Sequence, residues 1–308
     1  MNDPMIEATD VGKAFGAQKA LDGVSISVPK GTVLGLLGHN GAGKTTLVNV
    51  LTTMLPPDSG QARVAGFDVV RQAHQVRSRI GLTGQFASVD EGLSGLDNLV
   101  LIARLLGAST REAKARAGEL LELFDLTEAA KRPSRTYSGG MRRRLDLAAG
   151  LVGHPEVVFL DEPTTGLDPA SRLGLWEVVE RLVDDGTTVL LTTQYLDEAD
   201  RLADRITVLA QGKVVAAGTS AELKAQVGRR TVTVTLDDAS DVPKAQEALE
   251  RAGMQPVAAG ATLTAPVTSS RELAVVVRAL DEVGLEATEL ALAEPTLDDV
   301  YLTLAHAA

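Results

Sequence analysis

The residues best suited to chemistry form a glycine-rich run between an apolar segment and a segment of helical character. Residues 38–45 read Gly-His-Asn-Gly-Ala-Gly-Lys-Thr and fit the pattern GxxxxGK[ST]. The glycines let backbone N–H groups turn inward around phosphate oxygens, and the following helix directs its positive end at them. Lys44 supplies charge to the β- and γ-phosphates, and the Thr45 hydroxyl is a ligand for Mg²⁺. The candidate phosphate-binding residues are Gly38, His39, Asn40, Gly41, Ala42, Gly43, Lys44, Thr45 and Thr46.

This motif alone does not choose between GTPases, kinases, helicases and transport ATPases. The sequence lacks the Asn-Lys-x-Asp motif that reads guanine, which counts against a GTPase. Further on, residues 137–141 read Tyr-Ser-Gly-Gly-Met, residues 157–162 are four apolar residues followed by Asp-Glu, and residues 166–168 read Gly-Leu-Asp. These motifs, in this order, resemble those of the ATP-binding-cassette (ABC) ATPases over most of residues 5–222.

The resemblance implies a role for each motif. Ser138, Gly139 and Gly140 are the signature loop, an anion cradle at a helix N-terminus that completes the nucleotide site of an opposing subunit. Asp161 would hold Mg²⁺ directly or through water. Glu162 would be the general base that orients or deprotonates the attacking water. The other implied nucleotide-site residues are Phe15 on adenine, Asp168 in the D-loop, and Gln85, which begins the helical insert and is also a metal-ligand candidate.

The chain departs from the family pattern at two positions. ABC ATPases usually place a histidine after the strand expected at residues 188–191, and Gln194 occupies that position here. A glutamine amide can donate a hydrogen bond, but it carries no charge and does not titrate near neutral pH. We therefore expect an ATPase with Lys44, Glu162 and Gln194 as catalytic residues and no histidine-dependent step. Met141 stands where the family most often has glutamine, so one side-chain contact with nucleotide is lost.

The spacing of apolar residues predicts the elements that position these motifs. From about residue 5 to 222, short apolar runs alternate with helical segments, which predicts an α/β fold with a largely parallel sheet. The resemblance to the ABC ATPases implies that this fold is of the P-loop NTPase type. Residues 87–152 are expected to form a helical insert with a capping box at Ser109 and Glu112. In this insert, residues 142–144 are three arginines, for which a solvated helix face is favoured over an anion site.

The pattern changes after residue 228. Strands are expected at residues 231–236, 258–263 and 287–292, helices at 243–252 and 271–283, and a final helix at 297–304. An order close to βαββαβ suggests a small α+β domain of the ferredoxin-like type. The expected domains are an ABC ATPase nucleotide-binding domain at 1–225 and an accessory domain at 226–308.

Composition and charge limit the classes of partner that the chain could have. The 308 residues suggest about two domains, and 30 Lys and Arg against 41 Asp and Glu give a formal net charge of -11, which disfavours a nucleic-acid partner. The chain has no cysteine, which excludes disulfides and thiolate chemistry. No run approaches the ~18 apolar residues needed to span a bilayer. Any work at a membrane is therefore expected to use a partner for the spanning part.

Four segments, residues 85–90, 137–146, 193–200 and 297–301, look like those of the daunorubicin-resistance-type ATPases of bacterial drug exporters. This resemblance covers essentially the whole chain. It implies ATP and Mg²⁺ as cofactors, a homodimer upon ATP binding, and a separate multispanning permease. It also implies peripheral attachment to the cytoplasmic face of the membrane and export of a hydrophobic drug, antibiotic or lipid. A soluble ABC ATPase without a transporter and a nucleotide-sensing regulator remain the alternatives.

Overall fold

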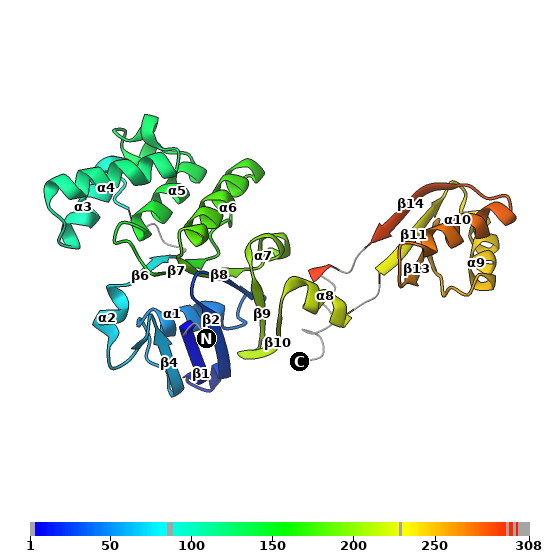
Figure 1. The fold of residues 1–308 in the computed structure, drawn as a ribbon, viewed down its shortest axis with the longest axis horizontal. Coiled ribbons are helices and arrows are strands. Elements are labelled where there is room, and N and C mark those ends of the chain that lie inside the picture. Colours follow the sequence, from blue (N-terminus) through cyan, green and yellow to red (C-terminus); the bar gives the residue numbers. More distant parts are fainter. Residues whose placement is uncertain (1–3, 85–88, 228–229, 294–295, 298–299, 301–308) are drawn as a thin grey trace. The chain divides into compact units, whose positions relative to one another are not determined.

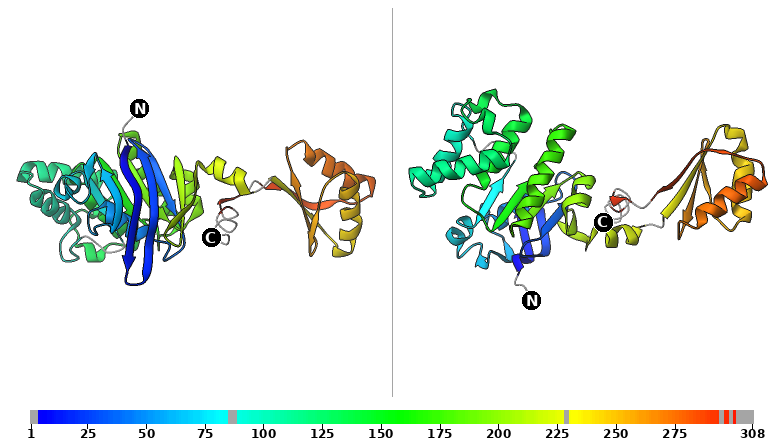
Figure 2. Two further views of the ribbon diagram at one scale, coloured as in Figure 1. Left: turned by 90° about the horizontal axis from the view of Figure 1, so that it is seen from below. Right: turned by 45° about the horizontal axis from the view of Figure 1, so that its top comes forward.

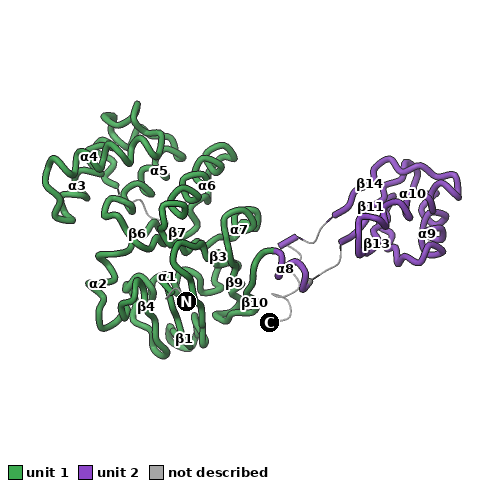
Figure 3. The backbone as a smooth tube through the Cα atoms, in the orientation of Figure 1, with its two compact units in different colours: residues 1–220, 307–308 green, residues 221–306 purple. Residues whose placement is uncertain are grey.

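The computed structural model describes residues 4–84, 89–227, 230–293, 296–297 and 300. The chain divides into two compact units, one running to Ser220 and the other starting at Ala221 (Figure 3). The first unit contains two sheets and the second unit one, as Figures 1 and 2 show. Buried hydrophobic residues form two clusters in the first unit and one in the second. Within the described residues, no helix is both long and apolar enough to cross a membrane.

The centre of the first unit is a six-stranded sheet with the order β10-β9-β3-β8-β7-β6. All neighbouring strands are parallel except β10, which pairs antiparallel with β9. Parallel sheets covered on both faces need continuous apolar strands, and every residue of β3, β7 and β8 is buried. The strands are β3 (Val33–Leu37), β6 (Ile80–Thr83), β7 (Val157–Asp161), β8 (Thr188–Thr193), β9 (Arg205–Ala210) and β10 (Lys213–Gly218).

A second, antiparallel sheet with the order β2-β1-β4-β5 flanks the first (Figure 1). Its strands are β1 (Pro4–Phe15), β2 (Gln18–Pro29), β4 (Ser59–Val64) and β5 (Phe67–Asp68). The sequence-based expectation of an alternating strand–helix pattern from residue 5 is wrong here, because two 12-residue strands follow each other directly. Their inner residues, such as Ile6 and Leu21, share one core with Leu47 and Phe159, so helix α1 (Lys44–Leu51) is fixed between the sheets.

Helices dominate the described part of residues 89–152. They are α3 (Gly95–Leu105), α4 (Thr110–Leu123) and α5 (Gly139–Gly150), with short 3-10 turns at Thr127–Ala129 and Ser134–Thr136. The predicted capping box is confirmed, since Ser109 accepts a hydrogen bond from the N–H of Glu112 and the Glu112 carboxylate accepts one from the N–H of Ser109. The remaining helices that end in the first unit are α2 (Ala73–Arg77), α6 (Pro169–Asp184) and α7 (Leu196–Leu202), and α8 (Ser220–Val227) follows them.

The second unit has the predicted βαββαβ order, with one correction. Its antiparallel sheet has the order β12-β13-β11-β14, in which the two halves of the chain interleave as in a ferredoxin-like fold. Residues 258–263, expected to form one strand, instead lie on both sides of a turn at Gly260, whose φ of +63° suits glycine. The expected helix at 297–304 lies largely outside the described residues. The elements are β11 (Arg230–Leu236), α9 (Val242–Arg251), β12 (Val257–Ala259), β13 (Thr262–Val267), α10 (Glu272–Glu282) and β14 (Ala287–Ala293).

The stability of the first unit depends on pH through one buried carboxyl group. Glu198 on α7 is fully buried, and its Oε1 accepts a hydrogen bond of 3.1 Å from Nε1 of Trp176 on α6. Burial raises the pKa of Glu198 above the usual 4.5. Over the pH range from about 4.5 to this higher value, the folded chain keeps a proton that the unfolded chain releases. The free energy of unfolding therefore falls as the pH rises through this range.

Replacing Glu198 by glutamine tests this sign. Glu198→Gln keeps an acceptor for Trp176 but cannot ionise, so it should raise the Tm of the first unit by about 2–4 °C at pH 8 and by almost nothing at pH 4.5. Thermal unfolding followed by circular dichroism at both pH values measures this. Glu180→Gln is the matched control, because the Glu180 side chain is 43% exposed and pairs with Arg201 at the surface. An equal gain at both pH values would contradict the account.

Candidate functional site

The glycine-rich loop joins β3 to α1 and has the conformation that its sequence requires. Gly41 and Gly43 have φ values of +85° and +107°, which other residues rarely adopt. A Cβ on Gly43 would also lie 2.5 Å from the carbonyl oxygen of Ala20. Helices α3, α4, α5 and α6 each begin with a side-chain cap, but α1 begins with Gly43, has no side-chain cap and has no acidic residue in its first turn. The positive end of α1 therefore suits an anion.

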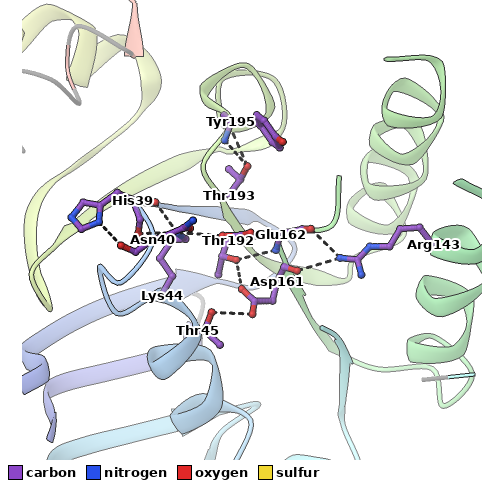
Figure 4. A network of polar contacts seen from close by, with 11 residues as sticks. His39, Asn40, Lys44, Thr45, Arg143, Asp161, Glu162, Thr192, Thr193 and Tyr195 are labelled. Atoms are coloured by element: carbon purple, nitrogen blue, oxygen red, sulfur yellow. Dashed lines mark hydrogen bonds and ion pairs between the residues drawn. The ribbon is translucent and has the colours of Figure 1, made fainter. Parts of the chain in front are cut away.

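Lys44 holds a buried positive charge at the start of α1 (Figure 4). Its side chain is only 4% exposed. The ammonium group donates to the carbonyl oxygens of Gly38 at 2.7 Å and His39 at 3.3 Å, and lies 3.5 Å from Oε1 of Glu162. A charge removed from water needs such partners. The predicted phosphate-binding lysine and the predicted general base are thus in direct contact.

Asp161, the last residue of β7, joins three segments through its carboxylate. Oδ2 accepts a hydrogen bond of 3.1 Å from the Thr45 hydroxyl on α1, and Oδ1 accepts one of 2.5 Å from the Thr192 hydroxyl on β8. Figure 4 shows these three side chains converging from their separate elements. Asp161 is 4% exposed, so it is a buried carboxylate held by hydroxyl groups.

Glu162 follows β7 with an unusual backbone conformation. Its φ is +49°, in the left-handed region that non-glycine residues rarely occupy outside functional or tightly held positions. Its N–H donates to both the carbonyl oxygen and the hydroxyl of Thr192, each at 3.1 Å. The side chain is 11% exposed and points its carboxylate at Lys44.

Beside this network lies an open hollow of about 530 Å³. Phe15, which is 53% exposed, supplies an aromatic surface in it, and Glu162 and Lys44 supply charges. The predicted site residues that line the hollow are Phe15, His39, Asn40, Gly41, Gly43, Lys44, Thr45, Thr46 and Glu162, and Gln18 and Ala20 join them. Sequence reasoning missed Gln18 and Ala20, which belong to no motif. Gly38 and Ala42 lie in the same loop but do not line the hollow.

Other predicted residues lie away from the hollow. Ser138 caps α5 by accepting a hydrogen bond from the N–H of Met141. A Cβ on Gly140 would lie 2.6 Å from Oγ of Ser171, so a larger residue there would require the Ser171 side chain to shift. Asp168 caps α6, and its hydrogen bonds with Ser171 lower its pKa. Gln194 is exposed just after β8. Gln85 lies outside the described residues. The roles of all these residues remain predictions.

The donors in the hollow fit a nucleoside triphosphate with a divalent cation. The uncapped first turn of α1 and the Lys44 ammonium are suited to phosphate oxygens. Mg²⁺ prefers hard oxygen ligands. The hydroxyl of Thr45 and the carboxylate of Asp161 are such ligands, and their oxygen atoms lie 3.1 Å apart. In the described part of the chain, no group of three or more His, Asp or Glu side chains could hold a metal alone. A metal here would therefore take further oxygens from the phosphates and from water, which is typical of Mg²⁺ bound with a nucleotide.

Two residues of the network escaped the sequence analysis. Thr192 lies in β8, which runs to Thr193, two residues beyond the strand end expected at residue 191. Arg143 was expected with its two neighbours on a solvated helix face, which is wrong. Arg143 is partly buried and donates to the main-chain carbonyls of Asp161 and Glu162. Its neighbours also have partners. Arg142 pairs with Glu91, and Arg144 donates to the carbonyl of Phe124.

The chain matches known proteins along almost its whole length. Residues 21–165 match the family model described as ABC transporter. The chain is 54% identical over 305 residues to the daunorubicin resistance ATP-binding protein DrrA3 of Streptomyces coeruleorubidus, covering 99% of this chain and 96% of that protein.

Solved structures agree in fold. The ADP conformation of MJ1267, an ATP-binding cassette of an ABC transporter, has a TM-score of 0.65 and 29% identity, covering 71% of this chain and 92% of that one. The dimeric post-hydrolysis state of the cassette MJ0796 bound to ADP and Pi has a TM-score of 0.64 and 24% identity, covering 70% and 98%, and is a likeness of fold. With the phosphate loop, the acidic strand end and the signature helix in one unit, the chain belongs to the family of ABC transporter ATP-binding proteins.

Proposed function

We propose that this chain binds ATP with Mg²⁺ and hydrolyses it to power export of a hydrophobic drug, antibiotic or lipid through a separate permease. The observation that carries the hydrolytic part is the contact of Lys44 with Glu162 beside the Asp161–Thr45 pair. The near-full-length similarity to a daunorubicin resistance ATP-binding protein supports the export part.

Each residue of the network has a chemical task in this proposal. Lys44 and the first turn of α1 bind and orient the phosphates, which positions the reacting atoms and offsets negative charge. Thr45 and Asp161 would hold Mg²⁺, which would supply positive charge beside the phosphates while the terminal phosphoryl group is transferred to water. Glu162 accepts a proton from, or orients, the attacking water. Phe15 stacks on the adenine ring.

A second copy of the chain completes the site in this proposal. Ser138, Gly139 and Gly140 lie at the N-terminus of α5, where helix N–H groups and the serine hydroxyl suit a phosphate. In one copy these residues do not line the hollow. We therefore infer that ATP binds between the hollow of one copy and the signature loop of another, so that ATP holds a homodimer together. Asp168 and Gln194 would act near this junction, and Gln85 would complete the metal site.

The export proposal assigns the remaining tasks to partners. A multispanning permease would carry the cargo, and the chain would bind it from the cytoplasmic side as a peripheral subunit. Within the chain, we propose that residues 1–225 bind nucleotide and contact the permease through the insert at 87–152. Residues 226–308 would serve subunit dimerisation or permease docking. The cargo would be read by the permease.

Loss of Lys44 or Glu162 should abolish turnover for different reasons. Lys44→Ala removes the charge on the phosphates and should lower the ATP hydrolysis rate by about 10²–10³-fold. Glu162→Gln removes the base and should lower it by about 10²–10⁴-fold while ATP still binds. Steady-state phosphate release with Mg²⁺ measures both. Glu156→Gln is the control, because Glu156 lies just before the start of β7, at the end far from Asp161 and Glu162, and is half exposed. Unchanged turnover in Glu162→Gln would refute the assignment.

The signature serine should matter for pairing of copies. In the Glu162→Gln background, added ATP should give a dimer by light scattering. Ser138→Ala should weaken ATP-driven dimerisation about tenfold, the effect expected from one lost hydrogen bond to a charged group. Ser109→Ala removes the N-cap of α4 in the same way without touching the proposed interface, so it controls for helix stability. Equal dimerisation in both serine variants would contradict the composite site.

Glutamine at position 194 should leave the rate insensitive to pH near neutrality. At saturating Mg²⁺ and ATP, kcat should be flat between about pH 6 and 8, whereas Gln194→His should add an inflection near the ordinary histidine pKa of about 6.5. Because His39 lines the hollow, both profiles are repeated with His39→Gln. An inflection near 6.5 that persists without either histidine would argue against the assignment.

A further inference from the structure

Arg143 connects the signature helix to the backbone of the catalytic segment. It lies in the second turn of α5, and its guanidinium reaches two other segments. Nη1 donates to the carbonyl oxygen of Gly84 at 2.7 Å, and Nε donates to that of Pro163 at 2.8 Å. Nη2 donates to those of Asp161 at 3.2 Å and Glu162 at 3.0 Å (Figure 4). All four acceptors are main-chain oxygens on the two strand ends β6 and β7.

The chemistry of the guanidinium suits this arrangement. Five N–H donors in a rigid plane can serve several carbonyls at fixed angles, which a flexible ammonium cannot. Burial lowers the pKa of Arg143, and the negative charges of Asp146, Asp161 and Glu198 oppose that shift. The group remains charged, because arginine does not lose its proton in proteins. A buried cation with only carbonyl acceptors makes strong, oriented hydrogen bonds.

The peptide groups on both sides of Glu162 are held by these contacts. Thr192 accepts from the Glu162 N–H, and Arg143 donates to the Glu162 carbonyl and to its two chain neighbours, Asp161 and Pro163. Between these contacts Glu162 keeps its left-handed φ of +49°. Such a conformation persists only when its surroundings over-determine it. Releasing the carbonyls would let the backbone relax and move the carboxylate away from Lys44.

We propose that Arg143 is a positioning residue for Glu162, which it holds in catalytic geometry from the signature helix α5. The inference rests on the proposed role of Glu162 as general base. It makes the geometry of the base depend on the place of α5, the same helix whose N-terminus carries Ser138.

A double-mutant cycle tests the proposal. Arg143→Met keeps the length of the side chain but removes its donors, and it should lower kcat by about 10–100-fold with KM for ATP changed less than about threefold. Arg143→Lys can donate to fewer carbonyls, so its kcat should lie between that of the parent and that of Arg143→Met. In the Glu162→Gln background, Arg143→Met should cost no further rate in single-turnover measurements, because its effect passes through the lost carboxylate. Arg142→Met is the control, since Arg142 is 35% exposed and pairs with Glu91.

The outcomes separate the two proposals. If the parent chain hydrolyses ATP, Glu162→Gln abolishes it and Arg143→Met matches the parent, the positioning role is wrong and the proposed function stands. Equal further losses from Arg143→Met in both backgrounds would also overturn it, as would a loss explained by weaker ATP binding or a lower Tm. If Glu162→Gln hydrolyses ATP as well as the parent, the general-base assignment on which this inference rests fails. If the parent itself does not hydrolyse ATP, the proposed function fails.

Discussion

The carboxylate of Asp161 is the point on which the site depends. It binds hydroxyls that lie 116 and 31 residues away in the sequence, those of Thr45 and Thr192. These groups meet because β3, β8 and β7 are adjacent parallel strands whose carboxyl ends face one edge of the sheet. A buried carboxylate is costly unless it is hydrogen-bonded or bound to a cation. The hydrophobic strands therefore position the charges, and the charges determine what this edge can bind.

The same edge brings a cation and a base together. Lys44 and Glu162 approach within 3.5 Å while both are largely shielded from water. In such surroundings the attraction of the Lys44 ammonium for a phosphate is stronger than it would be in solution. The uncapped first turn of α1 adds further positive character at the same place. These features support the proposed phosphoryl chemistry over simple anion storage, because the carboxylate proposed as the base lies beside the lysine proposed to bind phosphate.

Much of this site could be predicted because its residues are contiguous in the sequence. The loop around Lys44 and the Asp161–Glu162 pair each carry their chemistry within a few positions, directly after an apolar strand. Arg143 could not be predicted, because its partners are main-chain carbonyls, which leave no mark on the sequence. Its position among three arginines made a solvated face the simpler interpretation. Only the folded chain shows which guanidinium reaches the backbone at Asp161 and Glu162.

The fold was predicted unevenly for a related reason. Strands buried on both faces, such as β7 and β8, appear as continuous apolar runs. The strands β1 and β2 pair with several register shifts. In β1, buried and exposed residues do not alternate regularly, so the pattern that identifies a strand in sequence is broken there. In the second unit, all three residues of β12 are exposed, so that strand has no hydrophobic pattern and was merged with β13.

The measurement that tests the central claim most directly is calorimetric ATP binding with and without Mg²⁺, using Glu162→Gln so that no turnover occurs. The account predicts that Mg²⁺ strengthens ATP binding to this parent, and that adding Asp161→Asn removes about tenfold or more of that gain, or ~1.4 kcal/mol. Adding Glu156→Gln instead should leave the gain intact, because Glu156 is half exposed and lies before the start of β7, at the end of the strand far from Asp161. An equal gain from Mg²⁺ in the parent and in the Asp161→Asn chain would contradict the account.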